Sequence, residues 1–193
     1  MTFNDLSSPL ALLGSRRSAK ARDMVAPGPD AAQLDAMLAI ATRVPDHGKL
    51  APWRFVVIDP ERREAFAELL KTAFKAQKPE AEDFELEAAE QFARQAPTLV
   101  VALSAANPAS HIPVWEQQLS AGAAVMNLLH AATAMGFGAA WLTGWAAYDE
   151  TVLAALGQPG ERIAGFVFIG TPGRPLDEQP RPKPEQVVRH WGA

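Results

Sequence analysis

A segment rich in potential ligands occupies residues 43–55, which read RVPDHGKLAPWRF. It contains arginine, histidine, lysine and tryptophan side chains, which can bind an anionic or aromatic ligand. Pro45 disfavours the helical conformation at the residue before it, so the preceding helix is expected to end near Arg43. His47 would then lie on an irregular loop. Loops fixed between rigid elements often carry binding residues, but the pattern also fits a solvated connection whose prolines only set its path.

A second cluster of positive charge, RRSAK at residues 16–20, stands out in a chain with a formal net charge of -4. Guanidinium groups offer planar forks of donors to phosphate oxygens, a serine hydroxyl adds a further bond, and lysine supplies a mobile charge. The cluster therefore fits a phosphate group. It also fits a solvated helix end, where basic side chains interact favourably with the helix dipole.

The remaining residue types provide little catalytic machinery. The chain has no cysteine, which excludes disulfides, thiolate metal sites and a cysteine nucleophile. The histidines, including His130 in an apolar stretch, lack metal-binding spacing, so we predict no metal site. No GxSxG motif is present, and GFGAAW at 136–141 follows a predicted helix rather than a strand, unlike a dinucleotide fingerprint. We assign no catalytic side chain, and an enzyme built on the basic cluster would need an organic cofactor such as flavin mononucleotide (FMN).

Hydrophobic periodicity and capping residues predict the elements that position these clusters. Trp53 is expected to anchor its strand in the core, and Phe84, Leu86 and Phe92 to be the main buried residues of an acidic helix. The pattern predicts a mixed α/β or α+β sandwich, with the segment 22–30 as an irregular break. Helices are expected near 10–17, 31–44, 60–74, 80–95, 114–135 and 149–156, and strands near 53–59, 98–103, 138–144 and 163–170.

The organisation of the chain is simple in this interpretation. We predict one domain, 1–193, built around a central buried helix at 114–135. Its last part, 172–193, is rich in proline and lacks a hydrophobic period, so an extended tail is expected over the surface or a neighbouring subunit.

Composition and charge limit the partners. A net charge of -4 gives no general attraction for a polyanion, so nucleic acid is not expected. No stretch reaches the ~20 uninterrupted apolar residues that a spanning helix requires. The first residues also lack the order of a secretory signal. We therefore expect a cytoplasmic protein without membrane contact.

Three motifs in this order resemble the nitroreductase-like FMN oxidoreductases, particularly their small bacterial members of the YdjA type. The motifs are RRS at 16–18, RVPDHGKLAPWRFVVI at 43–58, and WEQQLSAGAAVMNLLHAATAMGFGAAWLTG at 115–144. The resemblance implies a three-layer α/β/α sandwich with a mostly antiparallel sheet and a long central helix. It also implies a homodimer with FMN at the interface, and a ping-pong reaction in which NAD(P)H reduces FMN and a nitroaromatic, quinone or related acceptor is then reduced.

The resemblance also implies roles for individual residues. Arg16, Arg17 and Ser18 would hold the FMN phosphate and ribityl region, and Lys20 would lie beside the N1 and O2 edge of the flavin. Arg43 and His47 would contact FMN from the partner subunit. The residues bordering the cofactor would be Trp141, Leu142 and Thr143, and those contacting nicotinamide would be Ala131, Ala132, Thr133, Ala134, Met135 and Gly136. Two alternatives stay open: a flavin-binding module without efficient turnover, and an FMN enzyme for another specific redox reaction.

Overall fold

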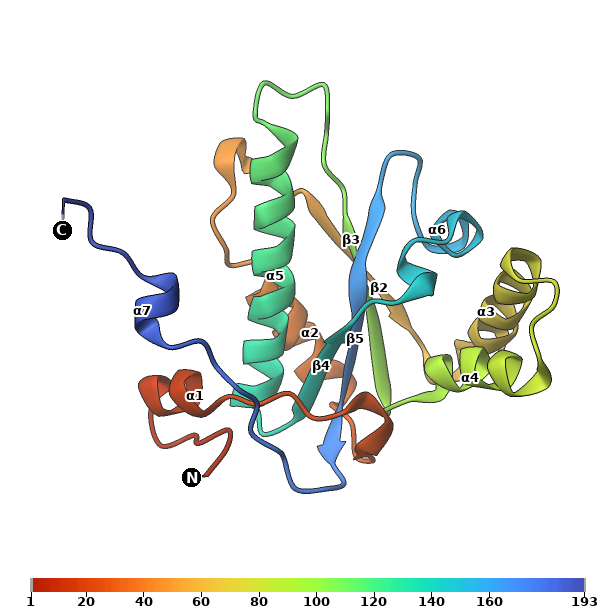
Figure 1. The fold of residues 1–193 in the computed structure, drawn as a ribbon, viewed down its shortest axis with the longest axis horizontal. Helices are drawn as coiled ribbons and strands as arrows, with labels where there is room; N and C mark the ends of the chain where they lie inside the picture. Colours follow the sequence, from red (N-terminus) through yellow and green to blue (C-terminus); the bar gives the residue numbers. More distant parts are fainter. Residues whose placement is uncertain (1, 193) are drawn as a thin grey trace.

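A five-stranded antiparallel sheet lies between two layers of helices in the computed structural model, which describes residues 2–192 (Figure 1). Strand β5 is central: it pairs with β3 and with β4 along its length, and its last residues pair with the short strand β1. Strand β2 pairs with β3 and completes the sheet. The strands are β1 (Met24–Val25), β2 (Trp53–Ile58), β3 (Thr98–Ser104), β4 (Gly138–Leu142) and β5 (Arg162–Pro172).

Alternating side chains of the central strands build a core on each face of the sheet. On one face, Leu99 and Phe168 pack in a cluster with α3 (Arg63–Gln77), α4 (Asp83–Arg94) and α6 (Glu150–Leu156). On the other, Val100 and Val167 pack with α2 (Ala31–Ala41) and α5 (Val114–Ala134). A strand buried on both faces needs such continuous apolar sequence. The three-layer sandwich and the long helix expected from the resemblance are confirmed.

Short polar signals set the ends of several helices. Ser8 Oγ accepts a hydrogen bond from Ala11 N at 3.1 Å at the start of α1 (Pro9–Ser15). Asp30 and Gln33 form a reciprocal capping box at the start of α2. After α5 the chain turns at Gly136, whose φ of 88° suits a residue without a Cβ. Short 3₁₀ turns also occur at Ala21–Asp23, His47–Lys49, Pro60–Arg62 and Trp145–Ala147.

Two predictions about the core are wrong. Phe84 is 66% exposed, and α4 instead buries Ala89 and Ala93. At 100° per residue Phe84 lies roughly 140° around the helix axis from Ala89, so both cannot face the sheet. Trp53 is only half-buried and belongs to neither core cluster, because it begins the edge strand β2 and pairs with Ser104 at the end of β3.

The break expected at 22–30 contains strand β1. This strand has only two residues, too few to show a periodic pattern in the sequence. The tail is largely without regular structure but includes the short helix α7 (Pro184–Val187). It leaves the end of β5, passes α1 and carries α7 away from the sheet (Figure 1). Over residues 2–192, the helices are all too short or too polar to cross a membrane.

Candidate functional site

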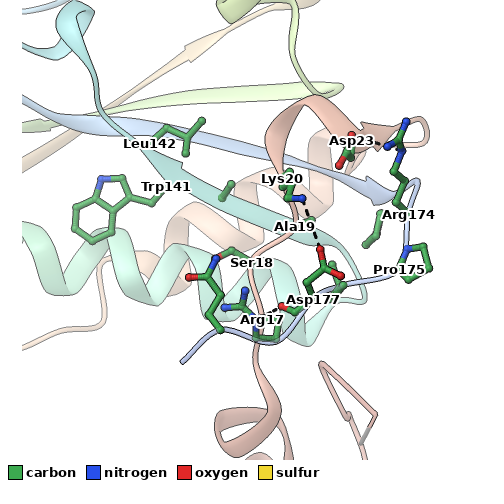
Figure 2. Close-up of a pocket in the computed structure, with 14 residues that line it drawn as sticks. Arg17, Ser18, Ala19, Lys20, Asp23, Trp141, Leu142, Arg174, Pro175 and Asp177 are labelled. Atoms are coloured by element: carbon green, nitrogen blue, oxygen red, sulfur yellow. Dashed lines mark hydrogen bonds and ion pairs between the residues drawn. The ribbon is translucent and has the colours of Figure 1, made fainter. Parts of the chain in front are cut away.

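A cavity of about 660 Å³ opens between the basic segment 16–20, strand β4 and the first part of the tail (Figure 2). The structure brings five of the predicted cofactor residues to its wall, although they come from segments more than a hundred positions apart in the sequence. These residues are Arg17, Ser18, Lys20, Trp141 and Leu142.

The basic segment is extended and lies beyond the end of α1. The helix ends at Ser15, its last turn contains no basic residue, and Arg16 already has a non-helical conformation with ψ of 125°. Arg17 N donates to Asn4 Oδ1 at 2.7 Å, which fixes the chain at this point. The alternative of basic side chains lining a helix end therefore does not describe this cluster.

Arg17 and Lys20 contact the tail. The Arg17 side chain is buried, and its Nε donates to the carbonyl oxygen of Asp177 at 2.8 Å and lies 3.6 Å from Glu178 Oε1. Lys20 Nζ lies 3.6 Å from Asp177 Oδ2, and Figure 2 shows Asp177 facing both cations. The sequence pattern predicts a tail over the surface or a neighbouring subunit, but it does not predict the part of the tail in this cavity. The acidic pair Asp177–Glu178 between basic residues was the available signal.

Arg16 is the cation of the cluster whose charge is least compensated. It is half-buried and does not itself line the cavity, but its Nη1 donates at 3.2 Å to the Oγ of Ser18, which does. Within residues 2–192 it forms no ion pair with a carboxylate. Burial, followed by the charges of Arg181 and Arg17, lowers the pKa of Arg16. A bound anion would relieve both the repulsion and the poor solvation of this guanidinium.

His130 on α5 lies close enough to Arg16 to feel its charge. It is half-buried, and burial is the main cause that lowers its pKa. The positive charge of Arg16 contributes further to the same shift. Arg181 from the tail and His130 are therefore two neighbours of Arg16 that sequence reasoning did not place at the site.

Trp141 and Leu142 provide the apolar part of the wall. The Trp141 side chain is 38% exposed, and its indole Nε1 donates to the carbonyl oxygen of Ala164 at 2.9 Å. Leu142 is half-buried against the core. Thr143 lies beyond the end of β4, is exposed and does not line the cavity. The indole offers an aromatic face beside the cationic segment.

The loop that contains Arg43 and His47 lies along α5 and not in this cavity. Ser120 Oγ donates to Pro45 O at 2.9 Å, and His47 Nδ1 lies 2.7 Å from Glu116 Oε2. Both Arg43 and His47 are exposed. Within one chain they are therefore separate from the basic cluster, and their contact with a cofactor of the partner subunit stays a prediction.

The predicted nicotinamide segment 131–136 is divided by burial. Ala131, Ala132 and Thr133 are at most 3% exposed and pack inside the protein, where Thr133 Oγ1 donates to Leu129 O at 2.8 Å. Ala134 and Gly136 are exposed, and Met135 is half-buried. None of the six lines the cavity. Only the last three offer a surface that a ligand outside this chain could contact.

Comparisons with known proteins identify the family and the fold. The chain is 35% identical over 164 residues to a protein of Escherichia coli (strain K12) named "Putative NAD(P)H nitroreductase YdjA", which covers 84% of this chain and 87% of that protein. A nitroreductase-like protein from Bacillus cereus shares the fold with a TM-score of 0.79 at 18% identity, covering 100% of this chain and 99% of the other. A nitroreductase with bound FMN from Bacteroides fragilis NCTC 9343 gives a TM-score of 0.68 at 23% identity, covering 92% and 96%.

The family model described as "Nitroreductase family" matches residues 13–171, which include the basic segment, strand β3 and the indole of the cavity wall. With its fold and its relatives in agreement, the chain belongs to the nitroreductase family.

Proposed function

We propose that this chain is an FMN-dependent oxidoreductase that uses NAD(P)H to reduce nitroaromatic, quinone or related acceptors. The observation that carries the proposal is the half-buried Arg16, without a carboxylate partner in residues 2–192, beside Ser18 and a cavity with an indole wall. The name of the Escherichia coli relative supports the nicotinamide donor, and the bound FMN in the Bacteroides fragilis structure supports the cofactor.

The residues present fit FMN in charge and in size. Arg16, Ser18 and Arg181 gather donors and positive charge suited to a phosphate. The cavity of about 660 Å³ falls within the range typical of small-molecule sites. The exposed face of Trp141 offers a surface for an aromatic ring system. FMN, when bound, would supply the two-electron redox chemistry, so no side chain needs to act as nucleophile or general base.

The protein would contribute binding, orientation and electrostatics. The Lys20 side chain is 59% exposed, and its Nζ lies 3.6 Å from the carboxylate of Asp177. Its positive charge at the cavity would favour electron-rich states of a bound ligand. In a homodimer, Arg43 and His47 would reach the cofactor of the partner subunit. Ala134, Met135 and Gly136 would be available to nicotinamide. Donor and acceptor would use one site in turn, as a ping-pong reaction requires.

The first test is FMN binding, followed by fluorescence quenching of the flavin. We expect about one FMN per chain and a loss of affinity of roughly tenfold or more in Arg16→Ala, because a charged hydrogen bond to phosphate is removed. Arg62→Ala is the matched control, since Arg62 is exposed and remote from the cavity. A wild-type chain that does not bind FMN would refute the proposal.

The second test separates an enzyme from a module that only binds flavin. In anaerobic stopped-flow mixing, NADPH or NADH should bleach the absorption of bound FMN, and an added quinone or nitroaromatic should restore it. Steady-state rates with varied donor and acceptor should give the parallel lines of a ping-pong reaction. Absence of bleaching with either nicotinamide would assign the chain to the binding class.

A further inference from the structure

Trp141 is held by a hydrogen bond that depends on an irregularity in strand β5. The pairing of β3 with β5 steps from Ala102–Gly165 to Leu103–Ile163, so Ala164 is an extra residue without a partner on β3. Such a β-bulge withdraws one residue from the regular ladder. The carbonyl oxygen of Ala164 accepts the hydrogen bond from Trp141 Nε1 at 2.9 Å. The bulge thus supplies the acceptor that orients the indole.

Gly165 leaves the space that the indole fills. Trp141 pairs with Val167, so Gly165 is its diagonal neighbour on the same face of the sheet. A Cβ on Gly165 would lie 2.0 Å from Trp141 Nε1 and 2.4 Å from its Cδ1, far inside any real contact. It would also lie 2.9 Å from the carbonyl oxygen of Leu142. Any side chain at this position would therefore force the indole out of its place.

The opposite edge of the indole faces α5 without such a constraint. A Cβ on Gly122 would lie 4.0 Å from Trp141 Cη2, which is an ordinary van der Waals distance. The hydrogen bond and the close packing that hold the indole therefore come from β5, while α5 makes only an ordinary contact with it. Its remaining exposed part contributes to the cavity wall.

We propose that Gly165, together with the bulge at Ala164, is a positioning residue for the redox reaction, because it fixes the Trp141 indole as a preformed wall of the cofactor site. This inference rests on the proposed function for the identity of the ligand. A wall that is already ordered loses little conformational freedom when a flat ligand binds against it. The hydrogen bond to Ala164 and the absence of a Cβ at Gly165 would then together raise the affinity for FMN and set the surroundings of the bound flavin ring.

The first experiment needs no cofactor. The indole N–H resonance of Trp141 is identified among the five tryptophans by its loss in Trp141→Phe, and its exchange with solvent is measured by nuclear magnetic resonance. In Gly165→Ala we expect the protection of this N–H to fall about tenfold or more, because the displaced indole can no longer donate to the carbonyl oxygen of Ala164. Gly122→Ala is the matched control and should leave the protection within about twofold. Unchanged protection in Gly165→Ala would overturn the inference.

The second experiment measures FMN binding and the absorption spectrum of the bound flavin. Gly165→Ala should raise the Kd about tenfold, the size of one lost aromatic contact, and should shift the flavin band. In a Trp141→Leu background the same glycine change should alter the Kd by less than about twofold, because its effect passes through the indole. An equal loss with and without Trp141 would mean a purely structural role and would overturn the inference.

The two proposals can fail separately. If the wild-type chain does not bind FMN, the proposed function is refuted, while the exchange of the indole N–H still decides whether Gly165 fixes Trp141. If FMN binds normally to a Gly165→Ala chain whose indole is displaced, the proposed function stands and the positioning role is refuted. The double variant also guards against misfolding of Gly165→Ala, since it removes the indole with which the new methyl would collide.

Discussion

Arg63 offers a sharp test of what holds the helical layer on one face of the sheet. Its buried guanidinium donates to four main-chain carbonyls: Ile58 at 3.2 Å, Ala93 at 2.7 Å, Gln95 at 3.2 Å and Pro97 at 3.1 Å. These carbonyls belong to the end of β2, the end of α4 and the approach to β3. Burial lowers the pKa of Arg63, and within residues 2–192 the side chain forms no ion pair with a carboxylate.

Replacement by methionine keeps an unbranched apolar stem and removes every donor. The bonds to Ile58 and Ala93 are buried, so the loss of their donor should cost about 1–3 kcal/mol each. The carbonyls of Gln95 and Pro97 are partly accessible, and water can replace much of what they lose. Removing a poorly solvated charge offsets part of the loss. We therefore expect Arg63→Met to lower the free energy of unfolding by about 3 kcal/mol.

The assay is urea unfolding followed by circular dichroism, with the melting temperature as a second measure. For a chain of this length the expected loss corresponds to a fall in Tm of roughly 6–12 °C. Arg62→Met is the control, because its exposed neighbouring side chain should change stability by no more than about 0.5 kcal/mol. If Arg63→Met proved as stable as the wild type, the carbonyls would not need the guanidinium, and the reasoning from buried acceptors would be refuted.

Three further predictions concern charge. Hydrogen bonds from Arg54 lower the pKa of Glu161, so their stabilisation is present above the ordinary glutamate pKa and is lost as pH falls through the lowered one. Glu161→Gln should therefore cost about 1–2 kcal/mol at neutral pH, with the difference vanishing in acid, as pH-dependent urea unfolding would show. Asp177→Asn should strengthen FMN binding about two- to fivefold at low salt, because it removes a competing carboxylate, and titration at two ionic strengths checks this. Burial, and then the charge of Arg16, lowers the pKa of His130, so Arg16→Ala should raise that pKa, as a magnetic resonance titration would show.

Elements with a strong local signal could be predicted from the sequence. The run TLVVAL becomes β3, where five consecutive residues are buried, and the helix expected at 31–44 forms as α2. Strand β1 could not be predicted, because it exists only through its pairing with the end of β5. The exposure of Phe84 depends on which side of α4 packs against the rest of the protein. Because apolar residues occur on more than one side of this helix, its sequence alone does not determine the buried side.

The candidate site was predictable in its residue types but not in its contacts. The sequence identifies the basic segment and the pair Trp141–Leu142 as separate motifs. The tail that completes the cavity has no periodic pattern that could be recognised. Arg17 and the carbonyl it binds are separated by 160 positions. Local sequence rules describe neighbours a few residues apart, so they cannot place such a contact.

Arg16 and Arg17 illustrate the limit most clearly, because they are adjacent, identical in type and different in role. In extended backbone, successive side chains point to opposite sides, so the two guanidinium groups lie in different surroundings. Arg17 is buried, and its Nε donates to the carbonyl oxygen of Asp177. Arg16 donates to Ser18 Oγ instead, and no carboxylate in residues 2–192 pairs with its charge. The sequence had suggested a helix reaching into the cluster, in which both would share one role. A single Arg17→Ala change should therefore loosen the tail, while Arg16→Ala should weaken anion binding, and these effects distinguish two residues that a motif treats as one.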